Sequence, residues 1–185
     1  ERISRMKRPV FIILVGHNGS GKTTLAKQLE KDIGINVVSG DPLRLLLKKE
    51  ILFFNDFDVS TLTNKGNITH EIISNYRETT CIALLNSNQN VIHDANSFEV
   101  SYRKNLIDKI RDKVPEVTTI IIYLKLDEKT ILERLANRPE KNWHNHYFEH
   151  KKDKLQEPNP NEAEQLFIYD QSNYQDILDK LRKLT

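Results

Sequence analysis

The sequence contains a single cysteine, Cys81, and no long hydrophobic run. One cysteine cannot form a disulfide within the chain, which fits a reducing compartment, and its place on an apolar helix face indicates a core residue. The longest apolar stretch, residues 10–15, is far shorter than the roughly 20 residues that cross a bilayer. The start of the chain also lacks the layout of a signal peptide. We therefore expect a cytoplasmic protein without a membrane partner.

The chain also carries little excess charge of either sign. Its formal net charge is +2, so composition does not force a general attraction to polyanions. Hydrophobic residues make up 38% and charged residues 29%, a balance typical of globular proteins. At 185 residues the chain has the size of one domain, and we expect residues 1–185 to form a single unit. It starts at Glu1 without a methionine and opens with basic residues, so one interpretation is a piece of a longer polypeptide.

Short apolar runs alternate with helical patterns along the chain. Residues 10–15 form a continuous apolar run between Pro9 and Gly16, which is typical of a strand buried on both faces of a parallel sheet. Further strands are predicted at 35–39, 91–94, 118–126 and 166–169, and helices at 25–33, 41–51, 68–85, 97–110, 127–138 and 174–184, with Ser97 and Asp127 as caps. This order predicts an α/β fold, a three-layer sandwich with a central parallel sheet and 10–15 as its central strand. Ligands of such folds lie at the carboxyl ends of the strands.

The segment from Arg138 to Pro160 is polar and rich in histidine, which predicts a mobile lid rather than core. Aromatic and histidine residues gather at 143–150, where they could stack on a nucleobase or simply pack within the lid. His144, His146 and His150 lack the further ligands that would complete a transition-metal site. The role of this cluster stays open.

One motif carries a specific chemistry. The segment Gly16-His17-Asn18-Gly19-Ser20-Gly21-Lys22-Thr23 fits the phosphate-loop pattern G-x-x-x-x-G-K-[ST] and stands between a predicted strand and a predicted helix. The glycines let backbone N–H groups wrap around phosphate oxygens, and the helix N-terminus adds a favourable dipole. We expect Lys22 to bridge the β and γ phosphates of a nucleotide and Thr23 to bind Mg²⁺. Thr24 completes the predicted nucleotide-binding segment.

The side of the site that receives a phosphoryl group must come from other residues. Asp41 follows the second predicted strand, at the same end of the sheet as the phosphate loop, where a carboxylate can accept the proton of an attacking hydroxyl. Its alternative role is a helix cap before Pro42. Arg44, one turn further, could hold an acceptor phosphate or pair with a carboxylate.

Three further charged residues are candidates for the donor side. Asp94 ends the third predicted strand and could hold Mg²⁺ through water, although a structural role at a strand end fits too. Arg134 and Arg138 lie four positions apart, the spacing that projects two guanidinium groups from one helix face toward a phosphate. Their alternative is a solvated helix face.

Together these motifs resemble phage-type 5′-hydroxyl polynucleotide kinases, over roughly residues 10–139. The elements that carry the resemblance occur in the family's order: the phosphate loop, Asp41-Pro42-Leu43-Arg44, His93-Asp94-Ala95-Asn96 followed by Arg103, and Glu133-Arg134 to Arg138. The resemblance implies a P-loop kinase-like fold, Asp41 as general base, Arg44 as acceptor-phosphate ligand, and Arg134 and Arg138 as lid arginines on the donor phosphates. Ala95 stands where the family has threonine, so that residue's role is in doubt.

The resemblance implies transfer of the γ-phosphate of ATP or GTP, with Mg²⁺, to the 5′-hydroxyl of a DNA or RNA end. A kinase for a sugar, an antibiotic or a nucleotide-sugar would use the same Asp41, and a nucleotide-regulated binding module would need only the phosphate loop. Fusion to another end-healing domain and assembly into a homo-oligomer are further expectations. The sequence does not choose between DNA and RNA or between donors.

Overall fold

The computed structural model describes residues 7–43, 46, 68–137 and 151–185. Its elements, in chain order, are β1 (Val10–Val15), α1 (Lys22–Ile33), β2 (Asn36–Ser39), α3 (Ile68–Asn86), β3 (Val91–Asp94), α4 (Val100–Lys113), β4 (Thr118–Leu124), α5 (Glu128–Ala136), a 3-10 turn η2 (Lys152–Lys154), β5 (Gln165–Tyr169), a second 3-10 turn η3 (Gln171–Asn173) and α7 (Tyr174–Leu184). Strands alternate with helices as the sequence predicted.

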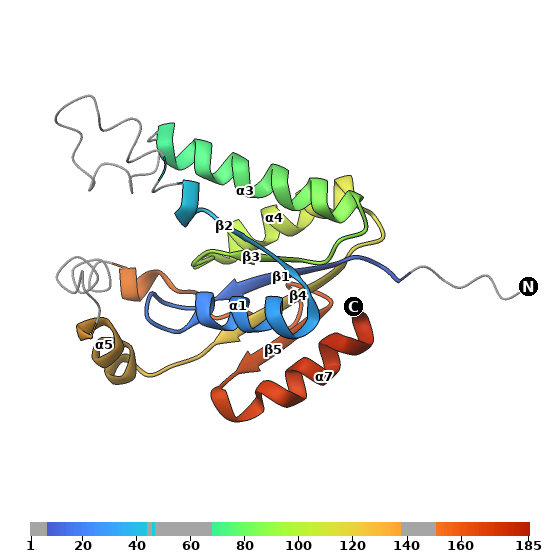
Figure 1. Cartoon of the computed structure of the whole chain (residues 1–185). Coiled ribbons are helices and arrows are strands. Elements are labelled where there is room, and N and C mark those ends of the chain that lie inside the picture. Colours follow the sequence, from blue (N-terminus) through green and yellow to red (C-terminus); the bar gives the residue numbers. More distant parts are fainter. Residues whose placement is uncertain (1–6, 44–45, 47–67, 138–150) are drawn as a thin grey trace, which may run out of the picture.

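The five strands form one parallel sheet in the order β2-β3-β1-β4-β5. Strand β1 lies in the middle, and each of its six residues is fully buried. This confirms residues 10–15 as the central strand. All strands run the same way, so their carboxyl ends meet at one edge of the sheet (Figure 1).

Successive residues of β1 point to opposite faces of the sheet and enter two separate cores. Val10, Ile12 and Leu14 pack with α1 and α7, whereas Phe11, Ile13 and Val15 pack with α3 and α4. Helices therefore cover both faces (Figure 1). The three-layer α/β sandwich of the prediction is confirmed, and Cys81 is fully buried in the core between α3, α4 and the sheet.

The structure differs from the prediction at several boundaries. Strand β2 begins one residue later than expected, and β4 ends at Leu124 rather than at residue 126. Asp127 caps α5 as predicted, because its carboxylate accepts a hydrogen bond from the Thr130 N–H. Ser97 does not cap α4: the N-cap is Glu99, and Ser97 has a φ of +50° and a buried hydroxyl without a partner among the described residues.

The structure describes only the second part of the predicted lid. Residues 138–150, which include Arg138 and the histidine cluster, lie outside the described residues. The following segment packs onto the body of the protein, since Leu155 contacts the core cluster beside α4 and the Gln156 N–H donates to the Phe98 carbonyl at 2.9 Å. The second part of the predicted lid thus contacts the body of the protein, and the lid over residues 138–160 stays a prediction.

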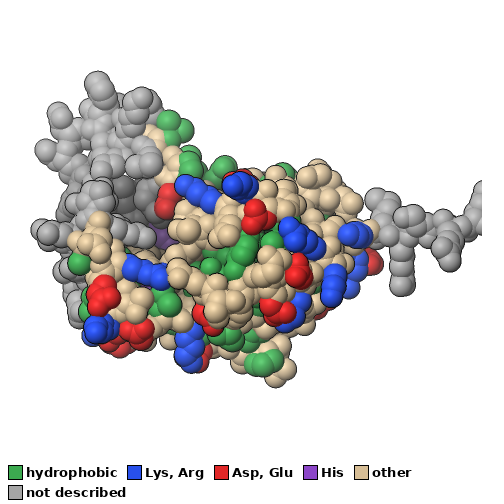
Figure 2. All heavy atoms as spheres, turned by 60° about the horizontal axis from the view of Figure 1, so that its bottom comes forward, with side chains coloured by type: hydrophobic (Ala, Val, Ile, Leu, Met, Phe, Trp, Pro, Cys, Tyr) green, Lys and Arg blue, Asp and Glu red, His purple; other side chains and the backbone are tan. Residues whose placement is uncertain are grey.

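The surface shown in Figure 2 carries lysine and arginine side chains interspersed with acidic ones over its described part. This mixture agrees with the formal charge of +2. No helix among the described ranges is both long and apolar enough to cross a membrane.

Candidate functional site

The phosphate loop connects the carboxyl end of β1 to the first turn of α1. Gly21 is the N-cap of α1 and has a φ of 97°, a left-handed conformation that glycine adopts without strain. Inside the loop, the Ser20 N–H donates to the His17 carbonyl at 3.1 Å. Helix α5 packs against the loop so closely that a Cβ on Gly19 would lie 3.0 Å from Leu135. The loop therefore has the strand-to-helix context that its motif requires.

Lys22 lies within the curve of this loop. Its ammonium group donates to the carbonyl oxygens of Gly16 at 2.8 Å and His17 at 2.7 Å, and the residue is only 7% exposed. These two bonds place the ammonium group next to the backbone N–H groups that would surround a phosphate. The structure thus brings Lys22 to the place that the motif predicts.

Thr23 and Asp94 meet although they are far apart in sequence. The Thr23 hydroxyl donates to the Asp94 carboxylate at 2.9 Å, across the gap between α1 and the end of β3. Asp94 is 6% exposed, and burial raises the pKa of its carboxyl group. A hydroxyl and a carboxylate beside a phosphate loop are hard oxygen ligands of the kind that Mg²⁺ prefers, so the donor set fits this ion.

A cavity of about 320 Å³ opens on the other side of the loop. It is bounded by the loop itself, the start of α1, the end of β4, α5, and the end of β5 with the residues after it, and its lining includes Gly19, Gly21, Thr24, Arg134, Tyr169 and Gln171. The sequence did not single out Tyr169 to Gln171 as site residues. Their position at the carboxyl end of a predicted parallel strand was the available signal, because that edge of the sheet carries the ligand site.

Arg134 reaches this cavity from α5. One nitrogen of its guanidinium group donates to the Ser20 carbonyl at 3.2 Å, and the same nitrogen would lie 3.6 Å from a Cβ on Gly21. The solvated helix face that was the alternative for Arg134 is therefore wrong. Its predicted companion Arg138 lies outside the described residues.

Asp41 lies two residues beyond the end of β2. Ser39 of β2 pairs in register with Asp94 of β3, so Asp41 extends past the edge where Asp94 ends its strand. The negative charge of Asp41 contributes to the raised pKa of Asp94 after burial, which indicates that the two carboxylates lie near each other. Residues 41–43 are helical, as predicted, and Arg44 lies outside the described residues.

Two histidines belong to this region and are neutral for the same reason. Burial lowers the pKa of His17, assisted by the charge of Lys22. His93, which precedes Asp94 on β3, is 1% exposed, and burial lowers its pKa to about 3, with help from the charge of Arg77. Arg77 could not be singled out from the sequence, because arginines recur along helices and no local motif surrounds this one.

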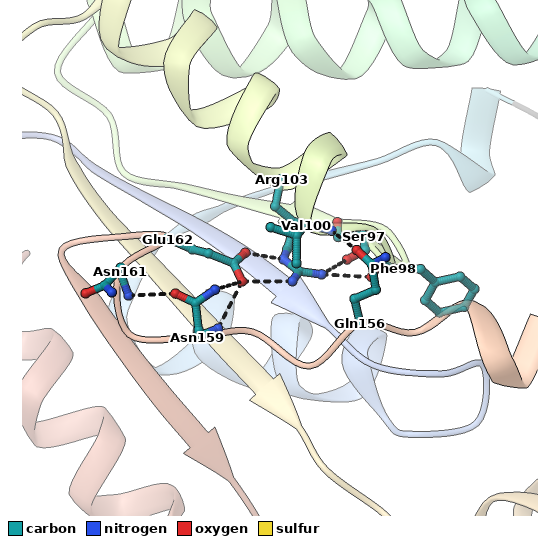
Figure 3. Close-up of polar contacts among 8 residues, drawn as sticks. All are labelled: Ser97, Phe98, Val100, Arg103, Gln156, Asn159, Asn161 and Glu162. Carbon is teal, nitrogen blue, oxygen red and sulfur yellow. Dashed lines mark hydrogen bonds and ion pairs between the residues drawn. The ribbon is translucent and has the colours of Figure 1, made fainter.

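A buried polar cluster holds the connection between β3 and α4 (Figure 3). Arg103 is fully buried and donates to Glu162 at 2.6 Å and 3.0 Å, and to the carbonyls of Ser97 at 2.8 Å and Phe98 at 2.9 Å. Glu162 also accepts from the backbone and side chain of Asn159 at 2.9 Å and 3.1 Å. The cluster thereby joins the β3–α4 connection to the segment that precedes β5.

This connection touches the phosphate loop. The ring of Phe98 lies 5.5 Å from the ring of His17, centroid to centroid, at an interplanar angle of 52°. Since Phe98 is held through its carbonyl by Arg103 and Gln156, the buried cluster supports one wall of the loop. The sequence analysis cited Arg103 only as part of a motif order and did not predict its partner Glu162.

Comparisons with known proteins show the family of the chain and support its fold. Residues 11–158, most of the chain, match the model of the AAA domain family AAA_33. A thymidylate kinase of Leptospira interrogans serogroup Icterohaemorrhagiae serovar copenhageni is 27% identical, and the match covers 72% of each protein.

Solved structures agree on the fold. Kti12 of Chaetomium thermophilum, in complex with ADP-AlF3, superposes with a TM-score of 0.69 at 16% identity and covers 94% of this chain and 98% of that one. A chain of a Pnkp1/Rnl/Hen1 complex has a TM-score of 0.55 at 24% identity, over 72% of this chain and 41% of that one. The chain belongs to the AAA domain family AAA_33 and has a P-loop kinase-like fold.

Proposed function

We propose that this protein transfers the γ-phosphate of ATP or GTP to the 5′-hydroxyl of a DNA or RNA end. The observation that carries the proposal is the position of Asp41. It lies at the carboxyl end of β2, near Asp94, which in turn accepts from Thr23 of the phosphate loop at 2.9 Å. A general base must lie across from the donor phosphates, and this edge of the sheet provides that place.

The donor is bound by residues 16–24. Their backbone N–H groups and Lys22 hold the phosphates, and the cavity between Thr24, Arg134 and Tyr169 takes the nucleoside. Arg134, with Arg138 as its predicted companion, stabilises the charge that spreads over the transferred group. Thr23, directly, and Asp94, through water, would hold Mg²⁺, which neutralises charge on the β and γ phosphates when it is bound.

In the transfer step, Asp41 accepts the proton of the attacking 5′-hydroxyl. The oxygen of that hydroxyl forms a bond to the γ-phosphorus in line with the bridging oxygen, whose bond to the same phosphorus breaks. The nucleoside diphosphate leaves with the electron pair, and the acceptor keeps a new phosphate monoester. Arg44 is the predicted ligand of the acceptor's own phosphate.

The thymidylate kinase relative favours a second candidate. A kinase that phosphorylates a nucleoside monophosphate would use the same donor site and the same acceptor edge, but its attacking group is a phosphate oxygen. That oxygen carries no proton at neutral pH, so such an enzyme would not need Asp41 as a base. The two functions therefore differ in how strongly they depend on Asp41.

The test measures transfer from γ-labelled ATP to a 5′-hydroxyl oligonucleotide and, separately, to thymidine monophosphate. For the wild type we expect transfer to the oligonucleotide, and for Asp41→Asn a fall in kcat of about 100- to 10,000-fold, with ATP affinity retained. Asp176→Asn, at an exposed carboxylate on α7, is the matched control and should keep full activity. Transfer to thymidine monophosphate alone would replace the proposal by the second candidate. Binding of ATP without transfer to either acceptor would favour a binding module.

A further inference from the structure

Arg77 on α3 is a half-buried arginine that makes no hydrogen bond and no ion pair with any residue in the described ranges. Its Nε atom is buried from solvent and has no partner there. A guanidinium group carries five N–H donors and is always charged, so removing any of them from water without a partner costs free energy. A structural arginine in this position would be expected to satisfy them, as Arg103 does.

The side chain of Arg77 lies at the acceptor edge of the sheet. Gly40 stands between the end of β2 and Asp41, and a Cβ at this position would lie 3.5 Å from Cδ and 3.7 Å from Nε of Arg77. The same Cβ would lie 2.5 Å from Ile73, so only glycine lets the end of β2 approach α3 this closely. Arg77 is therefore next to the chain that leads into Asp41.

The charge of Arg77 also acts on the neighbouring strand. Burial raises the pKa of Asp94, Tyr102 and Cys81, and the charge of Arg77 opposes that rise; burial lowers the pKa of His93, and the charge of Arg77 adds to that fall. Glu78, the adjacent carboxylate on α3, is already bonded to Lys109 at 2.9 Å. Arg77 is thus a cation without a hydrogen bond or ion pair in the described part of the chain, and it lies near two carboxylates, Asp41 and Asp94, that would otherwise repel an anionic acceptor.

We propose that Arg77 binds a phosphate group of the acceptor. This assignment rests on the proposed function, because it takes the edge around Asp41 as the acceptor side. The planar guanidinium fork matches two oxygens of a phosphate, and its positive charge offsets the negative charges of Asp41 and Asp94. The acceptor class is therefore a molecule with a phosphate close to the reacting hydroxyl, such as a nucleoside 3′-monophosphate or a polynucleotide, rather than an uncharged sugar.

The kinetic test compares two acceptors that differ only in that phosphate: a nucleoside 3′-monophosphate and the corresponding nucleoside. For Arg77→Met, we expect the KM of the phosphorylated acceptor to rise about 10- to 100-fold, the cost of losing a hydrogen-bonded charged partner. The KM of ATP and the KM of the plain nucleoside should not change. Arg77→Lys should recover part of the loss. Arg111→Met is the matched control, since Arg111 bonds Thr119 at the opposite end of the sheet. An equal effect on both acceptors, or none, would overturn the assignment.

A binding measurement separates this proposal from the proposed function. The protein is saturated with Mg²⁺ and a non-hydrolysable ATP analogue, and the Nε–H signal of Arg77 is identified in NMR spectra by its absence from Arg77→Lys. Titration with a nucleoside 3′-monophosphate should shift that signal, whether or not phosphoryl transfer occurs. If the wild type transfers nothing but the signal shifts, only the proposed reaction fails. If the signal does not move, the assignment of Arg77 fails.

Discussion

Arg103 and Arg77 lie on the two helices that cover the same face of the sheet, and they differ in what surrounds them. Arg103 is fully buried, and Glu162 and two carbonyl oxygens satisfy its guanidinium group. Arg77 is half-buried, and its Nε has no partner within the described part of the chain. Burial of a charge is costly in both cases, but only Arg103 is compensated by the fold itself. The comparison teaches that a saturated arginine supports structure, whereas an unsatisfied one at a site edge is available to a ligand.

The largest expected effect comes from removing Arg103, the arginine whose hydrogen bonds are all made within the fold. Arg103→Met removes one partner of a pair whose side chains are 0% and 4% exposed, and leaves the carboxylate of Glu162 buried without its cation. We expect the free energy of unfolding to fall by about 3–5 kcal/mol, measured by urea denaturation. The double variant Arg103→Met with Glu162→Leu should recover most of that loss, because no charge is then left unpaired. A single variant as stable as the wild type would contradict the role given to this pair.

The next effect is the pH dependence of stability that the lowered pKa of His93 produces. The pKa of His93 is lowered to about 3 by burial and by Arg77, so folding requires its neutral form. A lowered folded pKa means that this stability is fully present above the ordinary histidine pKa of about 6.5 and is lost as pH falls below it. Between pH 7 and pH 5 we expect a loss of about 2 kcal/mol from this group, measured by urea denaturation without divalent metal.

His93→Asn is the control for this loss of stability between pH 7 and pH 5. Asparagine does not titrate, so the contribution of His93 should disappear. Arg77→Met should leave the loss between pH 7 and pH 5 nearly unchanged, because that loss is set by the unfolded pKa, and should make the loss level off at a higher pH below that range, because one cause of the lowered folded pKa is removed. The same slope in His93→Asn as in the wild type would assign the pH dependence to other groups.

The smallest expected effect concerns the stability of Arg77→Met at neutral pH. Because Arg77 has no hydrogen bond or ion pair to lose among the described residues, the free energy of unfolding should change by less than about 0.5 kcal/mol. Thermal and urea denaturation of Arg77→Met and Arg103→Met, measured side by side, compare the two free energies of unfolding directly. A loss of several kcal/mol would show that Arg77 supports the fold, and it would remove the contrast between the two arginines.

Much of the fold could be predicted because its signals are local. The apolar run of β1, the cap at Asp127 and the bounds of α7 each depend on neighbouring residues, and the structure has them where the sequence placed them. Ser97 failed as a cap for a tertiary reason. Its carbonyl accepts from the buried Arg103, and its left-handed backbone lies outside the helix. Predictions for residues 138–150 and for Arg44 lie outside the described residues.

The candidate site divides in the same way. The phosphate loop is a contiguous motif, so Lys22 and Thr23 could be found from sequence spacing alone. The alternation of strands and helices was also enough to bring Asp41 and Asp94 to one edge, because parallel strands end there. Tyr169 to Gln171 and Arg77 have no such motif and emerge only from the folded chain. The single-domain organisation and the roles of the site residues stay predictions until the experiments are done.

The α/β class, the central strand and the phosphate loop follow from the sequence, since each depends on apolar periodicity or glycine spacing within a few residues. Which arginine has hydrogen-bond partners and which does not depends on how distant segments pack. Arg103 and Glu162 lie 59 positions apart, and they meet because the segment before β5 packs beside the start of α4. Arg77 lies on helix α3 without a local motif. It is placed near Asp41 only because Gly40 lets the end of β2 approach α3. The partner of a charged residue depends on which distant elements pack together, and local sequence patterns do not predict that packing.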